Sequence, residues 1–153
     1  MTDIASRLKA LNITLPAAAA PVAAYVPAVE HGGLLDLSGQ LPFERGELMT
    51  GRLGEDRDIA YGVRAARACG VMILAQIAKA ASLDRVSRII RLGVFVASSD
   101  RFTDQPKVAN GASELMEQVF GDIGRHARSA VGVPVLPLGA AVEIDAVIAL
   151  RPA

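Results

Sequence analysis

The chain has 153 residues, of which 52% are hydrophobic and 21% are charged, and its sixteen basic residues balance its sixteen acidic ones. This composition fits one compact domain with a filled core and excludes intrinsic disorder. The formal net charge of zero and the lack of a basic stripe argue against nucleic acid as a partner, because nucleic-acid binding needs a concentrated positive surface.

Cysteine use and hydropathy indicate a cytoplasmic protein without a membrane segment. The single cysteine, Cys69, cannot form an internal disulfide bond. The most apolar early stretch, residues 15–29, is interrupted by Pro16, Pro21 and Pro27, so it cannot form a membrane helix. We expect neither a membrane nor a nucleic acid among the partners of this chain.

The first part of the chain is predicted to be an N-terminal arm of about residues 1–21. A short helix over 3–11 begins it, and an extended, alanine-rich connector over 16–21 ends it. Two strands over 25–29 and 34–38 follow, and the glycine-bearing turn between them predicts a hairpin.

A polar, glycine-bearing segment over 42–54 follows, which we expect to be an exposed loop. The pattern then becomes helical from Asp56 or Asp58 to about Ala80, because apolar and small residues recur at alternating spacings of four and three. The acids at its start suit the helix dipole. This segment is the clearest helix in the sequence.

A long strand over 86–97 and a second helix over 108–120 come next. Period-two alternation places four apolar residues of the strand on one face, with Arg88 at the same parity: Ile90, Leu92, Val94 and Val96. In the simplest topology, a right-handed crossover over each helix makes the strands on either side of it parallel neighbours.

The last segment, 126–150, is predicted to be a hairpin with a strand over 128–136, a turn at 137–139 and a strand over 141–150. The final strand alternates, so Val142, Ile144 and Ile148 share one face while Glu143 and Asp145 lie on the other, beside Val147. The whole order predicts a single α+β domain over 1–153, with helices on one face of a mixed sheet.

Arg128 is the sharpest candidate for chemistry, because an unpaired guanidinium in an apolar strand is costly to bury. It must face solvent, an acid of its own fold or an anionic ligand. The residues alone favour a salt bridge to Glu143 or Asp145. In a cleft, Arg128 would instead hold a carboxylate, and Asp145 would orient a water or transfer a proton.

Other chemistries find little support in the sequence. His31 and His126 lie far apart in predicted turns, and Cys69 lies within a helix, so we expect no metal site. Ser38 and Ser129 lack the motif of a serine hydrolase and an obvious histidine partner. By pattern alone, Tyr25 is a strand residue and Asn110 a polar residue in the first turn of a helix.

Four stretches of the chain nevertheless resemble the Rid family, also called the YjgF or UK114 family. These are Tyr25 to Val29 (YVPAV), Leu37 to Pro42 (LSGQLP), Ala127 to Val131 (ARSAV) and Val142 to Ala146 (VEIDA), in the family order. The resemblance implies a chorismate-mutase-like α+β fold and a homotrimer with clefts between its subunits. It also implies hydrolysis of enamine or imine intermediates to keto acid and ammonia, without metal or organic cofactor.

The resemblance further assigns roles to single residues. Arg128 matches the arginine that holds the substrate carboxylate, Tyr25 a cleft tyrosine and Asn110 a cleft residue on the second helix, whereas Ser38 and Gly39 match the strand end that lines the cleft. Asp145 stands where active deaminases carry a glutamate associated with the attacking water, and Glu143 becomes a supporting acid.

Two functions follow as hypotheses. The first is an enamine/imine deaminase that acts on a small carboxylate substrate through Arg128 and Asp145. The alternative is a non-catalytic protein that binds a small carboxylate metabolite in the same intersubunit cleft. RNA cleavage, a function sometimes attributed to the family, is disfavoured by the neutral charge.

Overall fold

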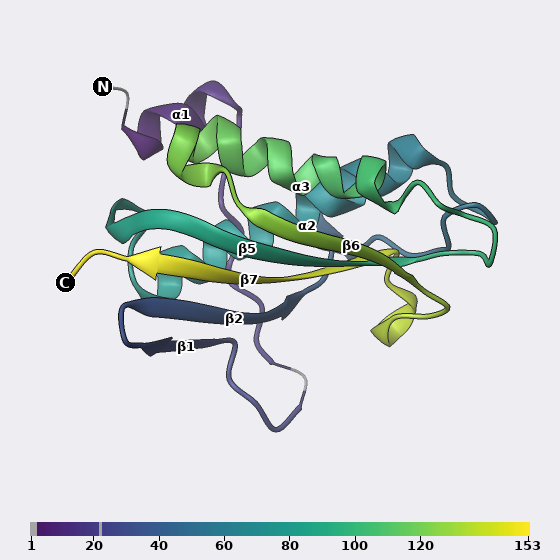
Figure 1. Ribbon diagram of the computed structural model, residues 1–153, viewed down its shortest axis with the longest axis horizontal. Coiled ribbons are helices and arrows are strands. Elements are labelled where there is room, and N and C mark those ends of the chain that lie inside the picture. Colours follow the sequence, from purple (N-terminus) through teal and green to yellow (C-terminus); the bar gives the residue numbers. More distant parts are fainter. Residues whose placement is uncertain (1–2, 22) are drawn as a thin grey trace.

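A computed structural model describes residues 3–21 and 23–153 of the chain. Its centre is a five-stranded sheet in the order β1-β2-β7-β5-β6, and its long helices lie on one face of that sheet (Figure 1). The predicted α+β class, with a mixed sheet and helices on one face, is therefore confirmed. The elements are α1 (Ile4–Ala10), β1 (Ala28–His31), β2 (Leu34–Gln40), β3 (Phe43–Glu44), β4 (Glu47–Leu48), α2 (Ile59–Ala80), β5 (Val86–Ala97), α3 (Gln105–Phe120), β6 (Ala127–Val133) and β7 (Val142–Leu150).

The helices form where the sequence predicted them, with one shift. Asp3 caps α1 and Asp58 caps α2, each by accepting a backbone N–H of the first turn, as N-cap aspartates do. Helix α3 begins at Gln105 instead of residue 108, because Pro106 fits the first turn of a helix, where its missing N–H has no role. No helix in the described ranges is long and apolar enough to cross a membrane.

Strand β7 lies at the centre of the sheet and fixes which face is covered. Its residues alternate between fully buried and half-buried, as predicted. Helix α2 packs over β2 and β7, and α3 packs over β5 and β6, so the buried face of β7 points to the helices. The other face carries Glu143 and Asp145, and no helix of the described residues covers it (Figure 1). We call this second face the open face.

The predicted hairpin of the last two strands is wrong, because β5 lies between them. The crossover through α3 makes β5 and β6 parallel neighbours, as expected. Strand β7 then pairs with the other side of β5 and with β2, antiparallel to both. The crossover through α2 therefore joins strands that are parallel but not adjacent. Alternation gives the faces of a strand but not its neighbours.

The predicted face of β5 is also wrong at its start. Ile89, not Ile90, is buried there, and Ile90 is the extra residue between the pairs that Ile89 and Arg91 form with β7. This β-bulge moves Arg88 off the face of the core as well, and a second register shift between Val86 and Arg88 returns Val86 to that face. From Leu92 onward the predicted buried alternation holds.

Residues 25–27 do not extend the first strand as predicted. Strand β1 begins at Ala28, and Tyr25 lies in a bend where its backbone N–H bonds to the carbonyl of Ala23 at 2.9 Å. Pro27 has no N–H for a sheet ladder, although its carbonyl accepts the N–H of Ser38 at 3.0 Å. The proline therefore marks the edge at which pairing begins.

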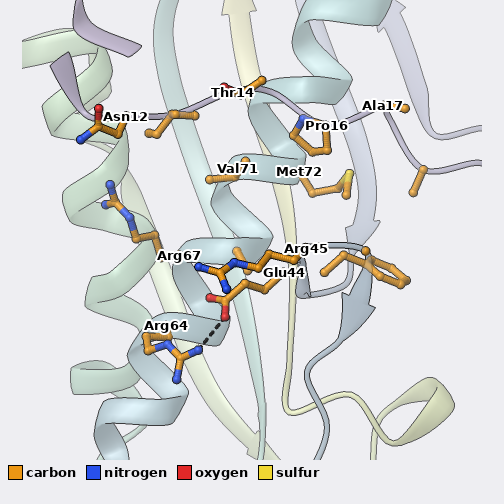
Figure 2. A pocket seen from close by; sticks show the side chains of 15 residues that line it. Asn12, Thr14, Pro16, Ala17, Glu44, Arg45, Arg64, Arg67, Val71 and Met72 are labelled. Atoms are coloured by element: carbon orange, nitrogen blue, oxygen red, sulfur yellow. Dashed lines mark hydrogen bonds and ion pairs between the residues drawn. The ribbon is translucent and has the colours of Figure 1, made fainter. Parts of the chain in front are cut away.

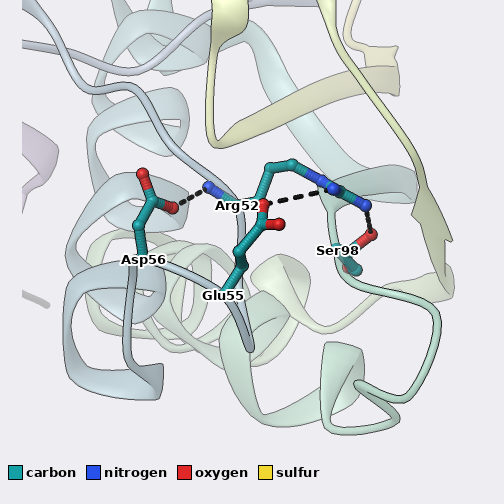
Figure 3. Close-up of polar contacts among 4 residues, drawn as sticks. All are labelled: Arg52, Glu55, Asp56 and Ser98. Carbon is teal, nitrogen blue, oxygen red and sulfur yellow. Dashed lines mark hydrogen bonds and ion pairs between the residues drawn. The ribbon is translucent and has the colours of Figure 1, made fainter.

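The segment over 42–54 is less exposed than predicted, because it carries the β3–β4 hairpin and buries Met49 and Leu53. The Arg52 guanidinium anchors it, since Nη2 donates to the Ser98 carbonyl at 2.7 Å and Nη1 pairs with Glu55 at 3.1 Å (Figure 3). The Arg52 N–H also donates to Asp56 at 2.7 Å. These polar contacts let a polar segment close one end of the core.

The N-terminal arm is attached at two points. Arg7 of α1 donates to the carbonyl of Val119 at 3.0 Å, which fixes α1 to the end of α3. Farther on, the buried Gln76 donates to the carbonyl of Ala19 at 2.9 Å and to Gln40 at 3.1 Å. Residues 12–18 therefore cross the helical layer between two fixed ends.

Candidate functional site

Arg128 lies on the edge strand β6 and reaches toward α3. Its Nη1 donates to Asn110 Oδ1 at 2.9 Å and to Ser113 Oγ at 3.1 Å, and its Nη2 donates to the Pro106 carbonyl at 3.3 Å. Among the described residues, the Nε–H and the second Nη2–H have no partner. These two N–H groups are left for a ligand, and a guanidinium can bind a carboxylate through two such donors.

The predicted salt bridge from Arg128 to Glu143 or Asp145 does not form, because the sheet separates these groups. Leu92 of β5 pairs with Arg128 on one side and with Ala146 on the other, so these three residues share the helix-covered face. Both acids alternate to the open face, two strands away. Sequence reasoning brought them together only through the hairpin that does not exist.

Ser113 and His126 complete the surroundings of Arg128, and the sequence did not single them out for this role. Ser113 Oγ lies 2.9 Å from His126 Nε2, and His126 Nδ1 lies 2.7 Å from the carbonyl of Gly124. A carbonyl only accepts, so Nδ1 carries the proton and Nε2 accepts from the serine hydroxyl. Ser113 follows Asn110 by one helical turn, which was the available signal.

Burial lowers the pKa of His126, and the nearby Arg128 and Arg88 lower it further, against an opposing contribution from the Gly124 carbonyl. The imidazole is therefore neutral at pH 7, which suits its role as an acceptor. Arg128 and His126 line a polar cavity of about 350 Å³ with Asn110, Ser113 and Glu117 among its other walls. An anion entering this cavity lies beside Arg128.

The acids on the open face lie against glycine backbones. Glu143 packs over Gly39, where an alanine Cβ would lie 2.9 Å from Glu143 Cδ and closer still to Oε1. Asp145 packs over Gly93 in the same way. Gly39 falls where the pairing of β2 with β7 shifts register, and such bulges are frequent beside active sites. These two glycines make room for the two carboxylates.

Both carboxyl groups are half-buried, and burial raises the pKa of each. The neighbouring Asp145 raises the pKa of Glu143 further. For Asp145, the Gly93 backbone N–H and the charge of Arg91 oppose the increase, whereas Asp36 adds to it. Raised carboxyl pKa values bring these acids closer to the range in which a general base works.

The predicted cleft residues on this side gather around the two acids. Tyr25, Gly39 and Glu143 line one cavity of about 140 Å³. Ser38, Gly39 and Asp145 line an adjoining cavity of about 580 Å³. Ser38 also donates to the carbonyl of Val26 at 2.8 Å, which holds the bend that carries Tyr25.

The predicted site residues therefore form two groups in one protomer. Arg128 and Asn110 lie at the β6 edge, and Tyr25, Ser38, Gly39 and Asp145 lie at the β1–β2 side with Glu143. The structure brings together the members of each group but not the two groups.

Other reactive side chains contribute little. Cys69 is fully buried, its Sγ contacts the Val142 carbonyl at 3.6 Å, and burial raises the pKa of its thiol well above the usual value, so it packs as a core residue. Within residues 3–21 and 23–153, no three histidine, cysteine or acidic side chains are close enough to hold a metal ion.

Known proteins share this arrangement along nearly the whole chain. A family described as "YjgF/chorismate_mutase-like, putative endoribonuclease" matches residues 5–148. Protein TCP17 of Trypanosoma cruzi is 52% identical over 151 residues, which is 97% of this chain and 94% of that protein. The crystal structure of Atu1372, a protein of unknown function from Agrobacterium tumefaciens, superposes with a TM-score of 0.90 at 48% identity, covering 97% of this chain and 92% of the other.

A more distant relative has a named activity. The 2-iminobutanoate/2-iminopropanoate deaminase of Dermatophagoides farinae is 27% identical over 141 residues, which is 91% of this chain and 95% of that protein. The match to the family extends from α1 into β7 and so includes every strand of the main sheet. With the observed fold, it shows that the chain belongs to the YjgF/chorismate mutase-like family, also called the Rid family.

Proposed function

We propose that the protein is an enamine/imine deaminase that converts reactive 2-imino acids to keto acids and ammonia, in clefts between the subunits of a homotrimer. The observation that carries the proposal is Arg128, which α3 holds through Nη1 and Nη2 while its Nε–H and one Nη2–H are left for a carboxylate. The relative that is named a 2-iminobutanoate/2-iminopropanoate deaminase supports this substrate class.

The surface of the sheet supports assembly. Three apolar side chains of the open face are strongly exposed in one protomer: Val29 at 52%, Leu34 at 44% and Val131 at 45%. The acids beside them are only half-buried. Apolar surface of this kind is typical of a protein interface. A partner subunit packed there would cover the apolar side chains and bring its own Arg128 toward the acids of this subunit.

The chemistry requires a carboxylate anchor and a base. Arg128 holds the substrate carboxylate, and the carboxylate pair of Glu143 and Asp145 on the neighbouring subunit removes a proton from water as its oxygen attacks the imine carbon. The resulting carbinolamine takes a proton on nitrogen. Its collapse forms the carbonyl and releases ammonia, so one imine and one water give one keto acid and one ammonia.

Glu143 and Asp145 have different surroundings, so they are not equivalent candidates for the base. Glu143 shares its cavity with the Tyr25 hydroxyl, which can hydrogen-bond to the water or to the imine nitrogen. Asp145 lies under the influence of Arg91 and Asp36 and lines the larger cavity with Ser38. Glu143→Gln and Asp145→Asn, measured side by side, determine which carboxylate is the base.

The direct test uses 2-aminoacrylate generated by a separate dehydratase. Purified protein is expected to accelerate its loss over buffer, and Arg128→Ala is expected to abolish that acceleration. If neither holds, the deaminase proposal fails. The Arg101→Gln variant, at an exposed arginine in the loop between β5 and α3, serves as the matched control and should behave as wild type.

The intersubunit cleft has its own test. Arg128→Ala and Glu143→Gln chains are co-expressed in equal amounts, so that an Arg128→Ala subunit can meet the intact arginine of a Glu143→Gln neighbour. Random assortment in a ring would restore about a quarter of the wild-type activity. If each single variant is inactive and the mixture stays inactive as well, the two groups do not meet across subunits.

A second function is favoured by the surroundings of Asp145, because the Gly93 backbone and the charge of Arg91 favour its ionised form and oppose the increase in its pKa. An acid held in this way activates water poorly, and Arg128 alone would then make a carboxylate-binding protein. Pyruvate or 2-oxobutanoate would raise the melting temperature without turnover of any imino acid, and the Arg128→Ala variant would lose that shift.

A further inference from the structure

We propose that a second cavity, on the helical side of the molecule, binds an anionic amphiphile: a carboxylate carried on an unbranched apolar chain. The cavity lies between residues 12–19 of the arm, the β3–β4 hairpin and α2, and we call it the arm cavity. Its volume of about 750 Å³ is within the range of small-molecule sites. It shares no wall with the Arg128 cavity.

One side of the arm cavity is apolar. Pro16 of the arm lies over Val71 and Met72 of α2 (Figure 2). Ile13 and Ala68 also line the cavity, and none of these side chains offers a charge to a ligand. Such a wall favours an alkyl chain, since each methylene removed from water contributes to binding.

The arm spans the cavity because both of its ends are fixed elsewhere. The Arg7 bond to Val119 holds one end, and the bond from the buried Gln76 to Ala19 holds the other. The space beneath the arm is therefore part of the folded structure and does not depend on a ligand to form it. A preformed cavity of this kind lowers the ordering cost of binding.

The other side of the cavity is cationic. Arg45, Arg64 and Arg67 lie here with a single acid, Glu44 (Figure 2). The acid pairs with Arg64 at 2.6 Å, and Arg67 donates only to the neutral Gln118, at 3.1 Å. In the part of the chain that the structure describes, no acid forms an ion pair with Arg45 or Arg67. Two guanidinium groups thus face the cavity uncompensated.

The arm cavity has its charged groups on one side and its apolar wall on the other, and this separation defines the ligand. A carboxylate can accept from Arg45 or Arg67 while its chain lies between the arm and α2. A neutral alcohol could accept a hydrogen bond from one guanidinium but would bring no negative charge to balance it, and a quaternary ammonium head would be repelled. A short carboxylate would make the polar contacts and leave the apolar wall in water.

The chain-length dependence of binding is the first test. Hexanoate, octanoate and decanoate are titrated into the full-length protein by calorimetry at low salt, below micelle-forming concentrations. Affinity is expected to increase with length, by up to about fourfold for each methylene that is fully buried. Decanol and decyltrimethylammonium are expected to bind at least about tenfold more weakly than decanoate, because neither carries the negative charge that pairs with arginine.

Variants then locate the ligand. Arg45→Gln and Arg67→Gln are each expected to weaken decanoate binding about tenfold. Val71→Trp is expected to abolish it by filling the cavity, and Arg101→Gln, remote from the cavity, should leave it unchanged. Thermal melts verify that each variant is folded, and deaminase activity of Arg67→Gln should equal wild type.

The proposal is overturned if affinity does not change with chain length, or if Arg45→Gln and Arg67→Gln both bind decanoate as tightly as wild type. It is also overturned if the protein sediments with phosphatidylglycerol vesicles but does not bind dispersed decanoate. The site does not depend on the deaminase proposal. If Arg128→Ala loses imine hydrolysis but binds decanoate as wild type does, the arm cavity and the deaminase site are independent.

Discussion

Replacing Gly39 by alanine tests whether the position of the Glu143 carboxylate matters for catalysis. The backbone at Gly39 is outside the left-handed region, so alanine is conformationally compatible there. Its Cβ would nevertheless lie 2.9 Å from Glu143 Cδ, where an ordinary contact is 3.4 Å or more, and the carboxylate oxygen would be closer still. The half-buried Glu143 side chain must therefore move by roughly 1 Å.

A displacement of that size at a reacting group is expected to lower kcat by about 10²-fold. The free energy of unfolding should change by less than about 1 kcal/mol, because the displaced group is the end of a flexible side chain and alanine reduces the entropy of the unfolded chain. The assay follows the loss of enzymatically generated 2-aminoacrylate, and urea unfolding measures the stability of the same preparations.

The matched control is Gly132→Ala on β6. Its Cβ would crowd the amide end of Gln105 at 2.6 Å, a comparable steric conflict with a flexible side chain that is not part of the proposed site. It should keep wild-type kcat. If Gly39→Ala is as active as wild type while remaining folded, the carboxylate of Glu143 is not positioned by Gly39 for catalysis.

Three further predictions concern the anchor, the acids and the arm. Arg128→Lys keeps the charge but cannot offer two parallel donors, so kcat/KM for imino acids should fall by about 10- to 100-fold, whereas equal values would contradict two-point binding. Because burial and Asp145 raise the pKa of Glu143, kcat/KM should rise with pH along a limb that lies above the ordinary glutamate range and shifts in Glu143→Gln. The raised folded-state pKa also means that ionised Glu143 lowers stability, so Glu143→Gln should be more stable than wild type above that pKa, with the difference vanishing below the pKa of the unfolded chain. Gln76→Ala removes a buried amide that bonds to the Ala19 and Gln40 oxygens and should cost about 1–3 kcal/mol in urea unfolding and speed proteolysis near residue 19, and unchanged cleavage would show that the arm is held by other contacts.

Most helices and long strands could be predicted from the sequence alone, because their signals are local. Asp58 predicted the start of α2, and the spacing of small and apolar residues predicted its buried stripe. The alternation of β7 predicted that Glu143 and Asp145 share a face opposite to the core. The four short motifs around Tyr25, Ser38, Arg128 and Glu143 predicted the family.

Only the tertiary structure decided which elements are neighbours. Strand order depends on packing and on crossovers through α2 and α3, and nothing in the alternation of β6 and β7 indicates that β5 lies between them. That single fact places Arg128 and the two acids on opposite faces of the sheet and moves the bonds of Arg128 to Asn110 and Ser113.

The same holds for features that depend on distant contacts. The bulge at Ile90 and the burial of Leu53 follow from pairing with β7 and β5, which residue patterns do not encode. The arm cavity likewise exists because Arg7 and Gln76 fix the arm at two points far apart in the sequence. Local periodicity fixes secondary structure, but a site assembled from separate segments is defined only once the chain has folded.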